Sequence, residues 1–227
     1  MTPKSVTKLA FTAALSVLIA SAAMSIKAPR ALANDDDGNS KVQIGLDAAP
    51  VPLKLTGRNK ALVGYGSYLV NVAGDCNGCH SAGPQTEYAP GGNPYFGQQP
   101  KAINPKTYLG GGRDFGPLIP GTPDIISRNL TPDSSGVPEG GGGFDEFVSI
   151  MRTGVDPDKL HPTCTPGMVP GTCFPAAAPF KGELLQIMPW PNFQDYSDQD
   201  LRAIYEYLKA VPCVQGNYPG ESASRCG

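Results

Sequence analysis

Apolar residues recur at three- and four-residue steps in three stretches of the chain, and each stretch is followed by a glycine or a proline. In the first stretch, residues 59–73, the side chains on one helical face are Leu62, Tyr65, Gly66, Leu69, Val72 and Ala73. This spacing is typical of an amphipathic α-helix, and Gly74 is a natural C-terminal stop. We therefore expect a helix of about four turns that ends directly before Cys76.

The second stretch, FDEFVSIMRTG, covers residues 144–154 and predicts a helix that stops at Gly154. Its buried face comprises Phe144, Phe147, Ile150 and Met151. A shorter helical piece, GELLQI, is expected at residues 182–187, directly before MPWPNF.

The third stretch, SDQDLRAIYEYLKAVP, covers residues 197–212 and has the clearest helical pattern of the three. Ser197 and Asp200 have the spacing of a capping box, and Pro212 ends the helix. The expected buried stripe comprises Leu201, Ile204, Tyr205 and Leu208.

The segments around these helices are rich in glycine and proline. Residues 34–57 show no clear periodicity and are interpreted as a flexible leader, and residues 81–143 hold 14 Gly and 10 Pro. No alternating strand pattern competes with the helices. The fold class is therefore expected to be mostly α, with long irregular loops. Three narrow apolar stripes bury little surface, so something else must fill the centre.

The N-terminus has the three parts of a secretory signal. Lys4 and Lys8 precede an apolar run at residues 9–23, and a small-residue site ends at Ala33. We expect removal of the signal peptide after Ala33, with Ala22 as the second choice. The alternative is an uncleaved membrane anchor, although the apolar run is short for a membrane span.

The charge of the remaining chain narrows the class of partner. Removing residues 1–33 leaves 14 basic and 20 acidic residues, a net charge of −6. Nucleic-acid binding calls for a basic surface, so no nucleic acid is expected, and a redox partner with a positive rim suits this charge better. We expect one domain at residues 58–212 and a C-terminal tail at 213–227.

The sequence CNGCH, residues 76–80, contains one of only two histidines in the chain. It can be a disulfide between neighbouring cysteines, with an ordinary surface histidine beside it. A second interpretation is a redox-active thiol pair, but such pairs lie at a strand-to-helix junction in α/β chains. A structural zinc site needs four ligands, and export to an oxidising compartment favours disulfides over thiolate cages.

A fourth reading of CNGCH is the attachment site of a c-type haem. Cys76 and Cys79 would form thioethers to the two vinyl groups, and His80 would bind the iron from the proximal side. The motif occurs once, so one covalent haem c is expected. Export and the unfilled centre of the fold favour this interpretation over the other three.

An electron-transfer haem usually needs a second axial ligand. The candidates are His161 and three methionines of the mature chain: Met151, Met168 and Met188. Met151 lies on the buried face of a helix, and Met168 lies on a loop between two cysteines. Met188 is followed by Pro189, which restricts the backbone, and it comes just before the last helix.

Taken together, these motifs resemble a class I c-type cytochrome. In that family an N-terminal helix leads into Cys-x-x-Cys-His, a Met-Pro loop follows, and a C-terminal helix crosses the first. The resemblance implies haem attachment at Cys76 and Cys79, His80 as proximal ligand and Met188 as distal ligand. The iron would then have both axial positions filled.

Three segments also resemble cytochrome c subunits of periplasmic dehydrogenases, including those for alcohols and sugar acids. These segments are SRNLTPD, FDEFVSIMRTGV and MPWPNFQDYSDQDLRAIYEYLKAVP, and the resemblance extends over residues 58–80 and 125–212. Those subunits often carry several haems, whereas this chain has one attachment motif. With one haem and both axial positions filled, we expect a periplasmic monohaem electron carrier that transfers electrons by an outer-sphere route and is not itself an enzyme. Its partners would be a dehydrogenase or an oxidase, and it would meet a membrane only with an uncleaved signal segment.

The rival interpretation is a haem enzyme with an open or labile sixth position, acting on peroxide or a sulfur compound. It would need Met188 to be displaced or unused, and His161 is the one histidine available for the distal side.

The remaining chemistry concerns four further cysteines and some hydrogen-bond donors. The cysteines allow three pairings. The pairing of nearest neighbours would join Cys164 to Cys173 and Cys213 to Cys226.

Hydrogen bonds to the haem and its ligand are also expected. The carbonyl of Pro84 is a candidate acceptor for the Nδ1–H of the haem histidine. Candidate donors to the haem propionates are Tyr108, Arg113, Arg128 and Trp190.

Overall fold

A computed structural model describes most of the chain after the N-terminal segment. The described residues are 35–138, 142–155, 166–167, 175, 181–216 and 221–227. The predictions for the signal segment, and those for His161, Cys164, Met168 and Cys173, fall outside these residues.

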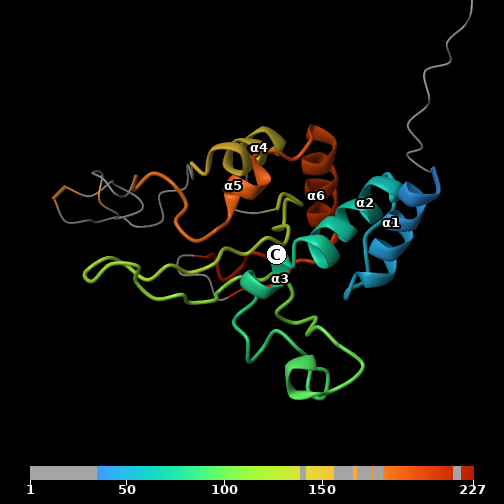
Figure 1. Ribbon diagram of the computed structural model, residues 1–227, viewed down its shortest axis with the longest axis horizontal. Coiled ribbons are helices and arrows are strands. Elements are labelled where there is room, and N and C mark those ends of the chain that lie inside the picture. The colour runs from blue at the N-terminus through green and yellow to red at the C-terminus, as the bar shows by residue number, and fades with distance from the viewer. Residues whose placement is uncertain (1–34, 139–141, 156–165, 168–174, 176–180, 217–220) are drawn as a thin grey trace, which may run out of the picture. The chain divides into compact units, whose positions relative to one another are not determined.

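All regular secondary structure in the described part of the chain is helical (Figure 1). The elements are α1 (Asp35–Ala48), α2 (Lys60–Tyr68), the π-helical turn η1 (Leu69–Ala73), α3 (Cys76–Cys79), the 3₁₀ turn η2 (Pro94–Phe96), α4 (Phe144–Thr153), α5 (Trp190–Phe193) and α6 (Asp198–Ala210). β-Pairing in these residues is limited to isolated β-bridges. The expectation of a mostly α fold is confirmed at this level.

Part of the expected flexible leader is helix α1, which packs against α2 (Figure 1). The two helices approach closely because a glycine stands on each side. A Cβ on Gly45 would overlap the carbonyl oxygen of Gly64, and Ser67 Oγ donates to the Gly45 carbonyl at 2.5 Å. Close backbone approach to α2 stabilises this helix, and such an approach does not require an apolar stripe. The pattern of apolar residues therefore does not predict the helix.

The helix expected at residues 59–73 is confirmed, with Asn59 as its N-cap. Its last turn is the π-helical η1, closed by the bond from Gly74 N to the Leu69 carbonyl. A π turn carries an extra residue, which rotates the end of the helix away from the predicted face. Consequently Val70 is buried, whereas Val72 is 47% exposed.

Helix α6 packs against α2 and confirms the predicted C-terminal helix. Its capping box of Ser197 and Asp200 is formed, and the predicted stripe is buried: Leu201, Ile204, Tyr205 and Leu208. A Cβ on Gly66 would overlap the Ala203 carbonyl, so the two backbones nearly touch. Tyr65 Oη also donates to Asp200 Oδ1 at 2.8 Å, which ties α2 to the first turn of α6.

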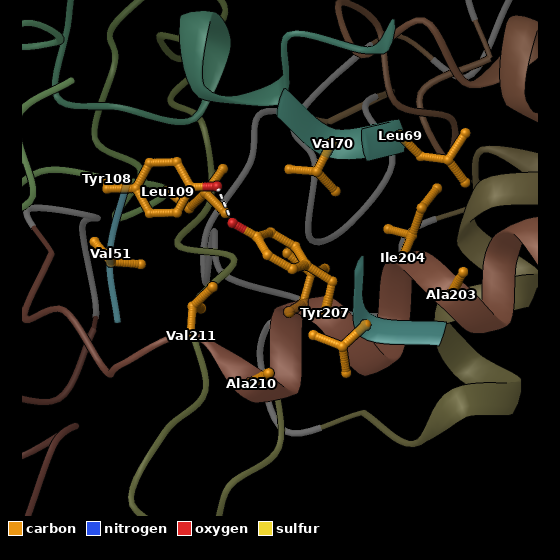
Figure 2. Packing of buried hydrophobic residues seen from close by; sticks show 12 residues of the cluster. Val51, Leu69, Val70, Tyr108, Leu109, Ala203, Ile204, Tyr207, Ala210 and Val211 are labelled. Atoms are coloured by element: carbon orange, nitrogen blue, oxygen red, sulfur yellow. Dashed lines mark hydrogen bonds between the residues drawn. The ribbon is translucent and has the colours of Figure 1, made fainter. Parts of the chain in front are cut away.

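The long loop after His80 supplies part of the core (Figure 2). Tyr108 and Leu109 are 1% and 0% exposed and pack with α2, η1 and α6. The hydroxyls of Tyr108 and Tyr207 lie 2.6 Å apart, as the dashed line in Figure 2 marks. Asn71 accepts from Tyr108 at 2.6 Å and donates to Tyr207 at 3.0 Å. Both tyrosine hydroxyls are therefore hydrogen-bonded, as buried polar groups usually are.

Two segments of this loop, residues 109–116 and 125–130, run antiparallel and are defined here as the ribbon. Its bonds include Gly112 N to the Ser127 carbonyl at 2.8 Å and Leu130 N to the Leu109 carbonyl at 2.8 Å. Apart from the 3₁₀ turn η2, the predicted lack of regular structure is confirmed for the described residues of this loop. Its backbone is nevertheless held by specific bonds.

Helix α4 forms as predicted and ends at Gly154, whose φ of +69° suits glycine. The helix expected at residues 182–187 is wrong, because Leu184 forms a β-bridge with Val155. The bond from Leu185 N to the Gly154 carbonyl at 2.8 Å continues this pairing. The next helical residues are those of α5.

The C-terminal tail is tied by one of the expected disulfides. Cys213 and Cys226 are bonded, with their Cα atoms 5.6 Å apart. Among the helices in the described part of the chain, none is both long and apolar enough to cross a membrane.

We expect Gly66→Ala to lower the free energy of unfolding by about 1–3 kcal/mol, because its Cβ has no room beside Ala203. Gly38→Ala is the control, since nothing lies within 4 Å of its Cβ and helical alanine is favoured over glycine. Denaturant unfolding of both variants measures the difference. Equal stability of the two would contradict the close approach of α2 and α6.

Candidate functional site

The two cysteines of CNGCH lie on a single helical turn, α3 (Figure 1). Asp75 enters this turn in the left-handed region at φ +45°, and His80 N donates to the Cys76 carbonyl at 2.8 Å. A Cβ on Gly78 would lie 2.9 Å from Asp75 Oδ2, so a small residue suits this position. Both cysteines are free thiols: Cys76 packs against the core and Cys79 is exposed.

The His80 ring is held by a residue 48 positions further along the chain. Its Nδ1 lies 2.8 Å from the Arg128 carbonyl oxygen. Because a carbonyl oxygen only accepts, Nδ1 carries the proton. No described residue forms a hydrogen bond with Nε2, so this atom is available to a ligand. The prediction that Pro84 would be the acceptor is wrong, since the ribbon brings Arg128 to the ring.

The ribbon also binds the CNGCH turn, through two backbone carbonyls and the Asn77 side chain. Gly111 N donates to the His80 carbonyl at 2.9 Å, and Leu109 N donates to Asn77 Oδ1 at 2.9 Å. The Arg113 guanidinium donates to the Gly78 carbonyl. Three residues of one ribbon segment therefore bind three residues of the turn, which fixes its orientation.

Gly111 makes this arrangement possible. Its φ is +67°, and an added Cβ would overlap the backbone between Arg128 and Asn129. The two ribbon segments can thus approach closely only with glycine here. One segment binds the His80 carbonyl and the other binds its ring.

Burial shifts the pKa values of Cys76 and His80 so that both side chains favour their neutral forms. It raises the pKa of the Cys76 thiol to about 12, with a smaller contribution from the Asp75 charge. Redox-active cysteines have depressed pKa values, so Cys76 does not fit the thiol-pair reading. Burial also lowers the pKa of His80, which favours the neutral imidazole that binds metals.

The free thiols likewise disagree with a disulfide between Cys76 and Cys79. Within the described residues, no cluster of three or more His, Cys, Asp or Glu side chains could hold a metal ion. Two buried polar atoms without a hydrogen-bond partner, Asn77 Nδ2 and Ser81 Oγ, lie in or next to the turn. Two free thiols, an oriented neutral imidazole and unpaired polar atoms fit a covalently attached haem.

The candidate donors to haem propionates are already engaged with the protein. Tyr108 donates its single proton to Asn71, and the Trp190 Nε1–H donates to the Leu185 carbonyl at 3.2 Å. Both groups therefore have protein partners in this structure, and a role for these two residues toward a haem stays a prediction. Arg113 has further N–H groups beyond its bond to Gly78, and the roles predicted for Arg113 and Arg128 stay predictions.

The segment that carries Met188 is braced by α4. A Cβ on Gly154 would overlap the Trp190 indole, and Arg152 binds both the Gln194 carbonyl and Asp198. At the end of this segment Tyr196 packs against the same core cluster as Cys76. Burial raises the pKa of Tyr196, and an electrostatic interaction with Cys76 adds to the rise. The segment thus reaches the core beside α3, while iron ligation by Met188 stays a prediction.

Comparison with known proteins identifies relatives of this chain. It is 31% identical over 164 residues to the gluconate 2-dehydrogenase cytochrome c subunit of Pantoea cypripedii, covering 70% of this chain and 26% of that protein. The chain is related to cytochrome c subunits. It is also 28% identical over 153 residues to the alcohol dehydrogenase (quinone) cytochrome c subunit of Gluconobacter oxydans (strain 621H), covering 66% of this chain and 21% of that subunit.

These cytochrome c subunits confirm the resemblance to dehydrogenase cytochromes noted from the sequence. The chain spans about a quarter of the length of the curated relatives it matches. No family model matches the chain. No solved structure matches it either.

We expect Gly111→Ala to lower the free energy of unfolding by about 2–4 kcal/mol, because it adds left-handed strain and overlap with Arg128. Gly116→Ala is the matched control: its φ is +71° but nothing lies within 4 Å, so the cost is about 1–2 kcal/mol. Chemical denaturation compares the two. Equal losses would show that the ribbon does not close on His80 as described.

Proposed function

We propose that this protein is a monohaem c-type cytochrome that carries single electrons, with haem c attached covalently to Cys76 and Cys79. One observation carries the proposal: two free thiols on one helical turn precede a histidine whose Nδ1 is bonded to Arg128. When bound, the haem would supply a one-electron redox centre. The naming of the relatives as cytochrome c subunits supports this.

The chain's own residues have distinct roles in this proposal. His80 presents Nε2 as the proximal ligand, and the Arg128 carbonyl fixes the ring orientation and tautomer. A hydrogen bond at Nδ1 raises the basicity of the ligand. The core residues beside Cys76, including Tyr108 and Tyr207, exclude water from this side of the site.

Met188 is proposed as the distal ligand. Pro189 follows it, the Met188 carbonyl accepts from Trp190 N at 2.8 Å, and Arg152 holds the residues beyond. This backbone is therefore restrained directly next to the thioether. Methionine ligation raises the potential of a haem, and filled axial positions leave outer-sphere transfer as the route.

The proposed partner is a dehydrogenase, because both relatives are named as cytochrome c subunits of dehydrogenases. The chain would accept electrons and would not catalyse the oxidation itself. We place it in the periplasm after removal of residues 1–33. Residues 58–212 would form the haem domain, and helix α1 would be an addition to its N-terminal helix.

Changing both Cys76 and Cys79 to Ala should abolish covalent haem, because no thioether can then form. Each single change should leave at most one. Denaturing gels stained for haem peroxidase activity measure this, with Cys213→Ala/Cys226→Ala as the control that keeps attachment. A haem band in the Cys76/Cys79 double variant would overturn the proposed site.

The oxidised protein should show a weak long-wavelength charge-transfer band from methionine sulfur bound to ferric haem. Met188→Ala should remove this band and lower the reduction potential, because thioether ligation favours ferrous iron. Met168→Ala and His161→Ala should leave both unchanged. Loss of the band in Met168→Ala instead would place the distal ligand on the other loop.

The same absorption measurements separate the electron carrier from a haem enzyme. With both axial positions filled, reduced wild-type protein should bind carbon monoxide slowly, and Met188→Ala should bind it rapidly. Rapid binding by the wild type would support an enzyme with an open or labile sixth position.

A further inference from the structure

The C-terminal loop, defined by the described residues 213–216 and 221–227, is bonded to the chain directly after Arg128. Asn129 Nδ2 donates to the Val214 carbonyl at 2.8 Å, and Val214 N donates to Thr131 Oγ1 at 3.0 Å. The Arg225 guanidinium donates to the Thr131 carbonyl. The loop is therefore bonded to residues 129–131. The residue before them, Arg128, supplies the carbonyl that binds the His80 ring.

The same loop packs on the other segment that binds His80. A Cβ on Gly216 would overlap the Gly110 carbonyl and lie 2.8 Å from Asn129 Nδ2. A Cβ on Gly110 would lie 2.8 Å from Val214 Cγ1. Gly110 directly precedes Gly111, which donates to the His80 carbonyl. Both attachments of His80 thus rest against one loop.

The loop is held by two internal bonds and by one bond to Ser134. The Cys213–Cys226 disulfide joins its ends. Arg225 and Glu221 form an ion pair at 3.3 Å, with side chains only 9% and 7% exposed. Ser134 N donates to the Arg225 carbonyl at 2.8 Å. Removing either partner of a buried ion pair is costly because it leaves the other charge buried alone.

We propose that the C-terminal loop positions the haem histidine, with Thr131 and Gly216 as positioning residues. The loop sets the spacing between Gly111 and Arg128 and so the strength of the Nδ1–H bond of His80. That bond controls how much electron density the imidazole gives to a metal. The inference rests on the proposed function, because it concerns the potential of the attached haem.

The first test uses Thr131 in the haem-loaded, full-length protein. Thr131→Val removes the acceptor for Val214 N without adding volume, and Thr131→Ser restores it. The midpoint potential should shift upward in Thr131→Val, because a weaker bond at Nδ1 leaves a poorer electron donor. It should return to the wild-type value in Thr131→Ser.

The second test compares two glycine variants that meet similar obstruction. Gly216→Ala presses on Gly110 and Asn129, whereas Gly92→Ala presses on Ala102 in a different loop. Both should lower the thermal midpoint. Only Gly216→Ala should also raise the potential and change the paramagnetic proton shifts of the His80 ring.

The outcomes separate the two proposals. A wild-type protein without covalent haem overturns the proposed function, and this inference with it. If haem is attached but Thr131→Val and Gly216→Ala lose stability with an unchanged potential, the loop is only structural and the inference is wrong. An equal potential shift in Gly92→Ala would also overturn it.

Discussion

The hydrogen bond between His80 Nδ1 and the Arg128 carbonyl is the interaction on which the site depends. It fixes the ring tautomer, leaves Nε2 for a ligand and connects the Cys-x-x-Cys turn to a segment 48 residues away. A carbonyl oxygen is a suitable partner because it accepts without adding charge beside a buried imidazole. The ligand geometry therefore depends on the placement of irregular backbone.

Irregular backbone keeps its shape here because its polar groups are paired. The ribbon satisfies its N–H and carbonyl groups across two segments, and Tyr108 anchors it in the core against Tyr207. Glycine at position 111 permits the close approach of the two ribbon segments, and glycine at position 66 permits the close approach of α2 and α6. The many glycines thus include several that allow backbones to touch.

The sequence predicted α2 with η1, α4 and α6, because their apolar stripes and end signals agree. The haem attachment expected at Cys-x-x-Cys-His rests on a local signal and stays a proposal. The sequence missed α1, which is held by the approach of Gly45 to Gly64, and it misplaced a helix at residues 182–187, where pairing with Val155 overrides local propensity. It named Pro84 as the acceptor for the His80 ring and missed the Arg128 carbonyl, because proximity in sequence does not reveal a contact 48 residues away.

Peptide mapping by mass spectrometry tests the central claim most directly. The protein should be produced with its N-terminal segment in a host that matures c-type cytochromes and then digested. The expected result is one haem per chain, carried by the peptide that contains Cys76 and Cys79. A chain without bound haem, or haem on any other peptide, would contradict the account.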